Sequence, residues 1–186
     1  MTSGHCLHPW LRPLGWIGVI VLASTAFGAA ESRPRVAPIE AVYAAFTINL
    51  TRFITWPAAA LGAPGEPFLI GSFPRDPINP DLDEAVRGET VAGHPVRTIR
   101  VGSLADVLRC RVVFLSRGVA DPGRLLAETR GHPILTISDA AGFLEHGGHV
   151  RFVSKPPHTR LEISAVNLRN SRLEARAQLL RLAALP

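Results

Sequence analysis

The sequence predicts an α/β fold: a mostly parallel sheet with helices on both faces, followed by an antiparallel hairpin and a long helix towards the C-terminus. Two observations carry the main part of this prediction. Short segments with strand character alternate with short segments of helical pattern, which is the order of elements in a parallel sheet with helical connections. Residues 111–116 (RVVFLS) and 132–138 (HPILTIS) are apolar runs with several β-branched residues, and such runs are typical of central strands buried on both faces.

The first predicted element is a helix that begins at Pro38, a residue that suits the first turn of a helix. The helix is expected to end near Trp56, because Pro57 disfavours the α conformation in the residue before it. Its apolar residues recur at steps of three and four, as on a helix that faces a core: Ile39, Val42, Phe46, Leu50 and Phe53. We then expect a buried strand, a helix and a half-buried strand over residues 67–73, 78–86 and 94–101.

Two short helices are predicted on either side of the first central strand. Ser103 can cap a helix over residues 104–108. Asp121 or Pro122 can open another, which runs to about Thr129. These two helices complete the alternating pattern.

The pattern changes towards the C-terminus. Residues 149–154 and 159–166 flank the sequence KPPH and are predicted to form the antiparallel hairpin. A long helix is then predicted from Asn167 to about Ala183. One of its faces would be apolar: Leu173, Ala177, Leu180 and Ala184.

The first thirty residues have the three parts of a secretory signal peptide. Arg12 supplies a positive charge, residues 14–26 are an apolar run, and Gly28 and Ala30 suit a cleavage site. The run is shorter than the roughly 20 residues that span a bilayer, although an uncleaved membrane anchor is the alternative. Cleavage near Ala30 would leave residues 31–186 as a single exported domain, large enough to bury a core.

Charge and cysteine content narrow the classes of function. The formal net charge is +5, and almost all of the basic residues are arginines. The sequence has no run of consecutive basic residues and no interleaved aromatic residues, so it does not indicate nucleic-acid binding. Beyond the signal segment Cys110 is the single cysteine, so an internal disulfide is not expected. We expect Cys110 to be buried as a small apolar residue.

No motif of catalysis or metal binding is recognisable. The sequence lacks GxSxG, HExxH and CxxC, and we predict no enzymatic activity, cofactor or metal. The nearest pair of histidines is in residues 146–149 (HGGH), whose glycines indicate a turn and not a ligand-bearing helix. A dispersed catalytic set is the alternative, and it would draw on Ser116, His132, Ser138 and Asp139.

The loop over residues 138–149 (SDAAGFLEHGGH) is the strongest candidate for a binding site. It follows the carboxyl end of a predicted central strand, where open α/β sheets place ligand crevices. Asp139 could orient a ligand or cap the turn after the strand. Gly147 and Gly148 allow backbone conformations that other residues resist and let another chain approach closely. Phe143 in the same loop is a candidate partner contact.

Two further features are candidate partner contacts. Arg169, Arg172 and Arg176 would share one face of the predicted C-terminal helix. Such a face is usually solvated, but it could also meet an acidic partner surface. Trp56, at the end of the first helix, is either a core residue or an anchor for a partner.

Five segments, in order, resemble the YfiR-like family of periplasmic proteins. They correspond to an opening helix that ends in Trp-Pro, a first strand and its turn, a Cys-led strand, a strand that leads to Gly-Phe and Gly-Gly, and a closing helix with a Leu-Leu pair. The segments are residues 43–57, 68–77, 109–116, 133–153 and 171–183. Each motif alone is weak, but together they span nearly the whole chain after residue 30.

The resemblance implies a periplasmic regulator that binds and represses an inner-membrane diguanylate cyclase of the GGDEF type, which lowers cyclic di-GMP and biofilm formation. It also implies an outer-membrane lipoprotein that relieves the repression, and no catalytic residues. Two departures from the family are apparent: Cys110 lacks a partner for an internal disulfide, and Ser164 stands where the family tends to have asparagine, with Asn167 slightly later. A homodimer bridged through Cys110 would require an exposed thiol.

The alternative is a periplasmic sensor that binds a small ligand in the crevice beside Asp139, Gly147 and Gly148. The two functions predict different results. A repressor predicts that deletion of the gene raises cyclic di-GMP and surface attachment, whereas a sensor predicts a thermal shift with a periplasmic metabolite.

Overall fold

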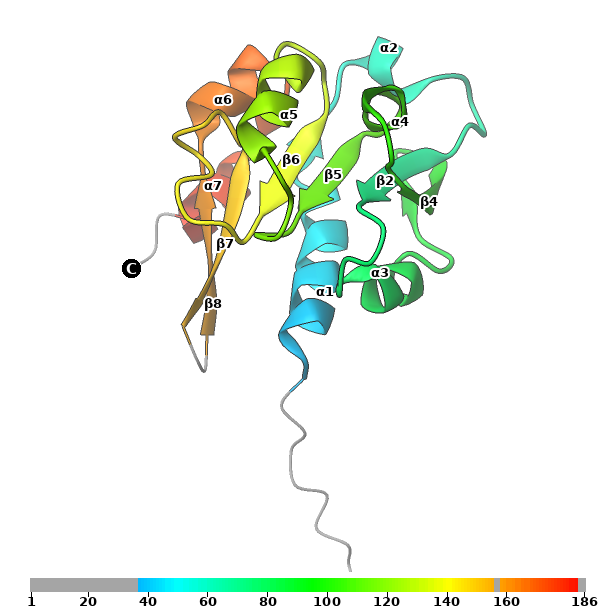
Figure 1. Ribbon diagram of the computed structural model, residues 1–186. Coiled ribbons are helices and arrows are strands. Elements are labelled where there is room, and N and C mark those ends of the chain that lie inside the picture. The colour runs from blue at the N-terminus through cyan, green and yellow to red at the C-terminus, as the bar shows by residue number, and fades with distance from the viewer. Residues whose placement is uncertain (1–36, 156–157, 184–186) are drawn as a thin grey trace, which may run out of the picture. The chain divides into compact units, whose positions relative to one another are not determined.

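The computed structural model describes residues 37–155 and 158–183 (Figure 1). The predicted signal peptide lies outside the described residues. The helices are α1 (Ile39–Thr51), α2 (Ala58–Leu61), α3 (Asn79–Ala85), α4 (Leu104–Arg109), α5 (Pro122–Thr129), α6 (Ala165–Asn170) and α7 (Ala177–Ala183). The strands are β1 (Ile54–Thr55), β2 (Phe68–Ser72), β3 (Thr90–Val91), β4 (His94–Arg100), β5 (Val112–Leu115), β6 (Leu135–Ser138), β7 (Val150–Lys155), β8 (His158–Ile163) and β9 (Glu174–Ala175).

The main sheet confirms the predicted α/β class and its mostly parallel strands. Its strand order is β3-β4-β2-β5-β6-β7-β8. The five strands β4, β2, β5, β6 and β7 run parallel to one another. The edge strands β3 and β8 are antiparallel to β4 and β7. The chain leaves β2 to form β4 on one side and then returns to form β5 on the other. The order therefore reverses between β2 and β5, and such a switch point is where open α/β sheets bind ligands.

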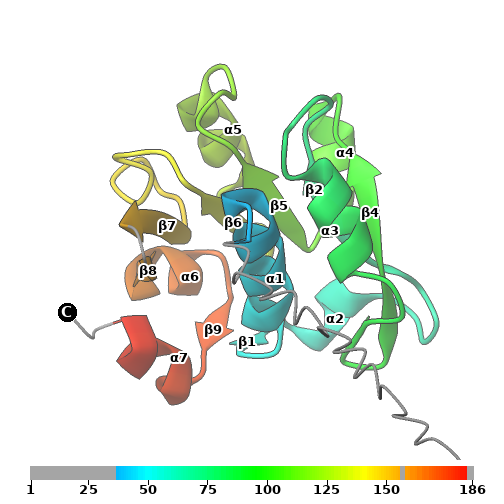
Figure 2. The ribbon, with the colours of Figure 1, turned by 90° about the horizontal axis from the view of Figure 1, so that it is seen from below.

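Apolar cores lie on both faces of the sheet, because the side chains of a strand alternate between its faces. In β5, Val112 and Phe114 belong to the larger core with α1 and α3, whereas Val113 and Leu115 belong to a second core with α4 and α5. Figure 2 shows α4 and α5 on one side of the sheet and α1, α6 and α7 on the other. The β-branched run that predicted a central strand is thus buried on both faces.

The first helix ends at Thr51 and not near Trp56 as predicted, because Ile54 and Thr55 pair with β9. The capping signals of two other helices are confirmed. Ser103 and Asp106 form a capping box at the start of α4, since each side chain binds the backbone N–H of the other. The Asp121 carboxylate accepts from the N–H of Arg124 at 3.0 Å and caps α5. The predicted hairpin is formed by β7 and β8, with Val150 opposite Ile163.

The prediction of a long C-terminal helix is wrong. The chain forms α6, turns at Arg172 with a φ of 57°, adds the strand β9 and only then forms α7. Leu168 and Leu173 are both almost fully buried. Residues five apart point in different directions on one helix, so the turn allows both leucines to enter the core. β9 pairs antiparallel with β1, with Ala175 opposite Ile54, and this contact joins the segment to the end of α1.

Candidate functional site

A cavity of about 370 Å³ lies at the switch point of the sheet, where β2 and β5 end. We call it the switch-point cavity. Its walls come from the first turns of α1, the β2–α3 loop and the loops after β5 and β6. They include Ile39, Glu40, Tyr43, Asp76, Ile78, Phe114, Arg117 and Asp139. Its volume lies within the range of small-molecule sites.

Asp139 joins the two loops that border the switch-point cavity. One of its oxygens accepts from the backbone N–H of Arg117 at 2.9 Å, and the other accepts from the Arg117 guanidinium at 2.8 and 2.7 Å. The Asp139 side chain is only 9% exposed. The hydrogen bond to Asp139 raises the pKa of Arg117. The pKa of Tyr43 is raised too, chiefly by burial and then by the charge of Asp139.

Asp76 is the buried acidic residue of the same cavity. Its Oδ1 accepts from the N–H of Ile78 at 3.1 Å, which shapes the turn into α3. Its Oδ2 is buried and has no hydrogen-bond partner within residues 37–155 and 158–183. Most buried polar atoms in folded proteins have a partner, so this oxygen is an unsatisfied acceptor in a residue that lines the cavity wall.

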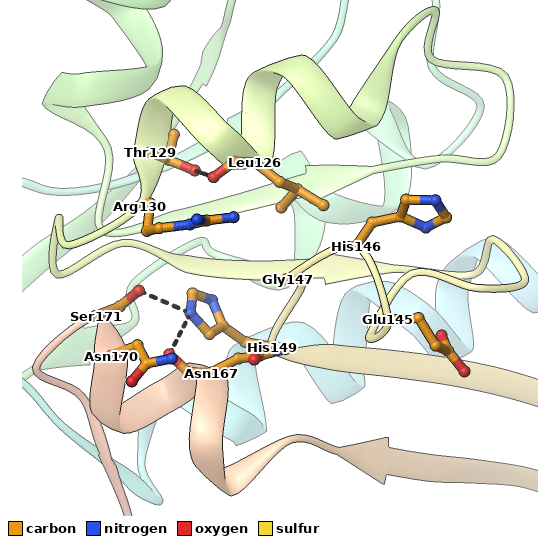
Figure 3. A pocket seen from close by; sticks show the side chains of 10 residues that line it. All are labelled: Leu126, Thr129, Arg130, Glu145, His146, Gly147, His149, Asn167, Asn170 and Ser171. Carbon is orange, nitrogen blue, oxygen red and sulfur yellow. Dashed lines mark hydrogen bonds between the residues drawn. The ribbon is translucent and has the colours of Figure 1, made fainter.

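A second cavity, of about 250 Å³, lies between α5, the loop before β7 and α6 (Figure 3). We call it the His149 cavity. Besides His149 its lining includes Arg130, Glu145, His146 and Gly147. In Figure 3 the imidazole of His149 points towards Ser171 and Asn167, whereas the His146 side chain lies apart from it. Gly147 therefore lines this cavity and not the one beside Asp139.

His149 has partners at both ring nitrogens. The backbone N–H of Thr136 donates to Nδ1 at 3.0 Å, so the ring proton is on Nε2, which faces Asn167 O at 3.2 Å and Ser171 Oγ at 3.0 Å. Burial lowers the pKa of His149 to about 4, and the bond to the Asn167 carbonyl opposes this effect. The histidine is thus neutral near pH 7 and connects β6 to α6.

The loop before His149 is held by close packing. The Asn167 side chain donates to the carbonyls of Leu144 at 2.9 Å and Gly148 at 2.7 Å. A Cβ on Gly148 would overlap the ring of Phe143, which is 2% exposed. Gly147 has a φ of 99°. The two glycines and the phenylalanine are thus positioned by the packing of the loop itself.

The other predicted contact residues are separated in space. Trp56 is 7% exposed and packs edge-on against Phe68, with ring centroids 5.1 Å apart. Arg169, Arg172 and Arg176 are exposed but lie on α6, in the turn and after β9. They do not share a helix face as predicted, because the helix is interrupted. Arg172 donates to the carbonyl of Gly131 at 2.9 Å.

Comparison with known families decides the identity of the chain. The model of the YfiR/HmsC-like family matches residues 40–184. The chain belongs to the YfiR/HmsC-like family. Proteins of this family are in general periplasmic regulators of cyclic di-GMP signalling, and the family is not known for enzymatic activity. Within the described residues no helix is long and apolar enough to cross a membrane. No curated protein matches the sequence.

The thiol of this YfiR/HmsC-like protein is buried, as predicted. Cys110 has no exposed surface, and its Sγ donates to the carbonyl of Asp106 at 3.3 Å. Burial raises its pKa to about 12. Reactive cysteines have lowered pKa values and are accessible, so Cys110 is not placed to form a bridge between two copies. Among the described residues no group of three His, Cys, Asp or Glu side chains could hold a metal ion.

Sequence reasoning missed several residues of these cavities. Arg117 follows one central strand as Asp139 follows the next, and this parallel placement was a usable signal. Asn167 was noticed as a departure from the family pattern, but its bridging role depends on α6 lying against the Gly147–Gly148 loop. The only sequence feature of Asp76 is its place in a Pro-rich turn. An ordinary turn residue has the same placement, so the sequence did not indicate a binding role for Asp76.

Proposed function

We propose that the protein is a periplasmic repressor that binds a membrane-bound signalling partner, a diguanylate cyclase, and thereby lowers cyclic di-GMP and biofilm formation. The observation that carries the proposal is the family match over residues 40–184. In this proposal the first thirty residues are a signal peptide that is cleaved near Ala30. An outer-membrane lipoprotein is the proposed antagonist that relieves the repression.

The surface proposed to bind the cyclase is basic. Arg169 and Arg176 are exposed, and neither forms an ion pair among the described residues. Val166 on the same segment is 57% exposed. Val166 and Arg169 are three residues apart on α6 and are therefore neighbours on its surface. An arginine beside an exposed apolar side chain would complement a partner surface that is acidic and partly apolar. Trp56 and Phe143 are buried, so they support the fold beneath any contact surface.

Deletion of the gene tests the proposal in cells. If the protein represses a cyclase, its removal raises cellular cyclic di-GMP and surface attachment, and removal of the cyclase as well restores the low level. The measurement is the cyclic di-GMP content of the single and double deletion strains. Unchanged cyclic di-GMP in a single deletion strain that expresses the cyclase contradicts the proposal.

A charge reversal tests the proposed surface. We expect the double variant Arg169→Glu and Arg176→Glu to lose binding to the periplasmic domain of the cyclase by about ten-fold or more, because each reversal replaces an attraction with a repulsion. Arg97→Glu is the matched control, since Arg97 is an exposed arginine on β4. Equal binding of the double variant and the wild type would exclude this surface. Thermal unfolding of all variants shows whether they remain folded.

A small-ligand sensor is the second candidate function, and the switch-point cavity favours it. The two functions are compatible, because a ligand could control the affinity for the cyclase. The crevice first expected beside Asp139, Gly147 and Gly148 is divided in the structure. Asp139 lines the switch-point cavity, whereas Gly147 lines the His149 cavity.

A further inference from the structure

We propose that the switch-point cavity is a binding site for a small organic cation, an ammonium group carried on an aliphatic or aromatic body. The site does not depend on the proposed cyclase, because it is formed by this chain alone. Its position at the switch point of a parallel sheet, its unbalanced charge and its unsatisfied carboxylate oxygen together lead to this class of ligand.

The charged side chains of the cavity are unbalanced. Arg117 and Asp139 neutralise each other through three contacts. Glu40 and Asp76 also line the cavity, and neither has a cationic partner among the described residues. The remaining charge of the cavity is therefore negative, which attracts a cation and repels an anion.

The unsatisfied oxygen of Asp76 specifies a hydrogen-bond donor. Asp76 is 6% exposed, and its Oδ1 is already used by the N–H of Ile78. Its Oδ2 has no donor among the residues that the structure describes, and leaving a buried acceptor unpaired is unfavourable. Oδ2 itself has almost no accessible surface, so a rotation of the Asp76 side chain towards the cavity would let an ammonium N–H of a ligand supply the missing donor. Three other residues, Thr47, Trp56 and Arg151, also have an unpaired buried atom, but none of them lines either cavity.

The remaining walls select an apolar body for the ligand. Tyr43, Ile78 and Phe114 line the cavity and are each at most 4% exposed. Burial of apolar ligand surface against such side chains is favourable. The His149 cavity lacks this combination, because both ring nitrogens of its buried histidine already have partners.

A set of three matched probes tests the charge preference. The probes are 2-phenylethylamine, 2-phenylethanol and 3-phenylpropanoate, which carry a cationic, neutral or anionic group on the same phenylethyl body. Binding to the purified full chain is measured by calorimetry and by NMR shift changes. We expect the amine to bind at least about ten-fold more tightly than the alcohol or the anion, because a hydrogen bond to a charged group contributes most. Equal binding of all three probes, or no binding of the amine, overturns the proposal.

Two variants connect the binding to this cavity. Asp76→Asn keeps the Oδ1 acceptor for Ile78 but removes the charge, so we expect amine binding to weaken by about ten-fold or more. Glu84→Gln is the matched control, because Glu84 is an exposed carboxylate on α3. Should Asp76→Asn not fold, Glu40→Gln tests the same charge at the other wall. Wild-type affinity in the folded cavity variant overturns the proposal. No cyclase is present in the assay, so its failure and the failure of repression are separate results.

Discussion

The His149 cavity and the switch-point cavity both contain a buried polar side chain, but the two side chains differ in how completely the chain satisfies them. His149 uses both ring nitrogens in bonds to β6 and to the α6 segment. Asp76 uses one oxygen in the turn before α3 and leaves the other without a donor. The first arrangement joins secondary structure elements, whereas the second leaves an acceptor without a donor from the described residues.

This difference separates a stabilising network from a binding site. A buried group with all its partners contributes to stability, and removal of one partner leaves the others unpaired. A group that lacks a partner contributes less to the fold and more to recognition of a ligand. Changes near His149 should therefore alter stability and its pH dependence, whereas changes at Asp76 should alter binding and leave stability nearly unchanged.

The largest expected effect is the loss of stability in acid that His149 causes. Its folded pKa is about 4 and its ordinary value is 6.5, so between these pH values the unfolded chain binds a proton that the folded chain does not. Stability is therefore full above pH 6.5 and falls as the pH drops towards 4. One pKa unit corresponds to about 1.4 kcal/mol, so this histidine lowers the free energy of unfolding by about 3 kcal/mol between pH 7 and pH 4.

Urea unfolding of the wild type and of His149→Asn over this pH range measures the effect. The asparagine Oδ1 can still accept from the N–H of Thr136, but it does not titrate. The difference between the two pH profiles isolates His149 from the carboxylates. Identical slopes for the two proteins between pH 6.5 and pH 4 would show that His149 is not a buried neutral group.

An intermediate effect is expected for Gly148→Ala. The added Cβ would overlap the buried ring of Phe143, and overpacking of this kind typically costs about 2 kcal/mol. Gly102→Ala is the matched control, because nothing lies within 4 Å of a Cβ placed there. The free energy of unfolding of both variants is measured by urea titration. Equal stabilities would mean that the loop repacks without cost and that Gly148 is not constrained by Phe143.

The smallest expected effect on stability is that of Asp76→Asn. The variant keeps the bond to the Ile78 N–H and replaces an unpaired carboxylate oxygen with an amide NH2. One unpaired buried polar group is exchanged for another, so the free energy of unfolding should change by less than about 1 kcal/mol. His149→Ala provides the contrast, because it leaves the Thr136 N–H buried without an acceptor and should cost about 2 kcal/mol. If Asp76→Asn lost as much free energy of unfolding as His149→Ala, the distinction between the two cavities would not hold.

Local sequence patterns accounted for most of the fold. Ser103 and Asp121 cap the helices that their positions predicted, and the run containing Val112 to Leu115 is a central strand. These features depend on hydrogen bonds between near neighbours or on the period of side-chain burial, so they are readable from a short window. The two-residue strands β1, β3 and β9 are too short to have a period, and they were missed.

What the sequence by itself determined is therefore the order and type of most elements, the burial of Cys110 and the family of the chain. Only the tertiary structure decided the rest. The C-terminal helix is interrupted because Leu168 and Leu173 must both enter the core. Asp139 meets Arg117 because two parallel strands end side by side. Asp76 has an unpaired oxygen because no donor from the described elements reaches it. Each of these outcomes depends on which distant segments become neighbours, and that information is not present in a local pattern.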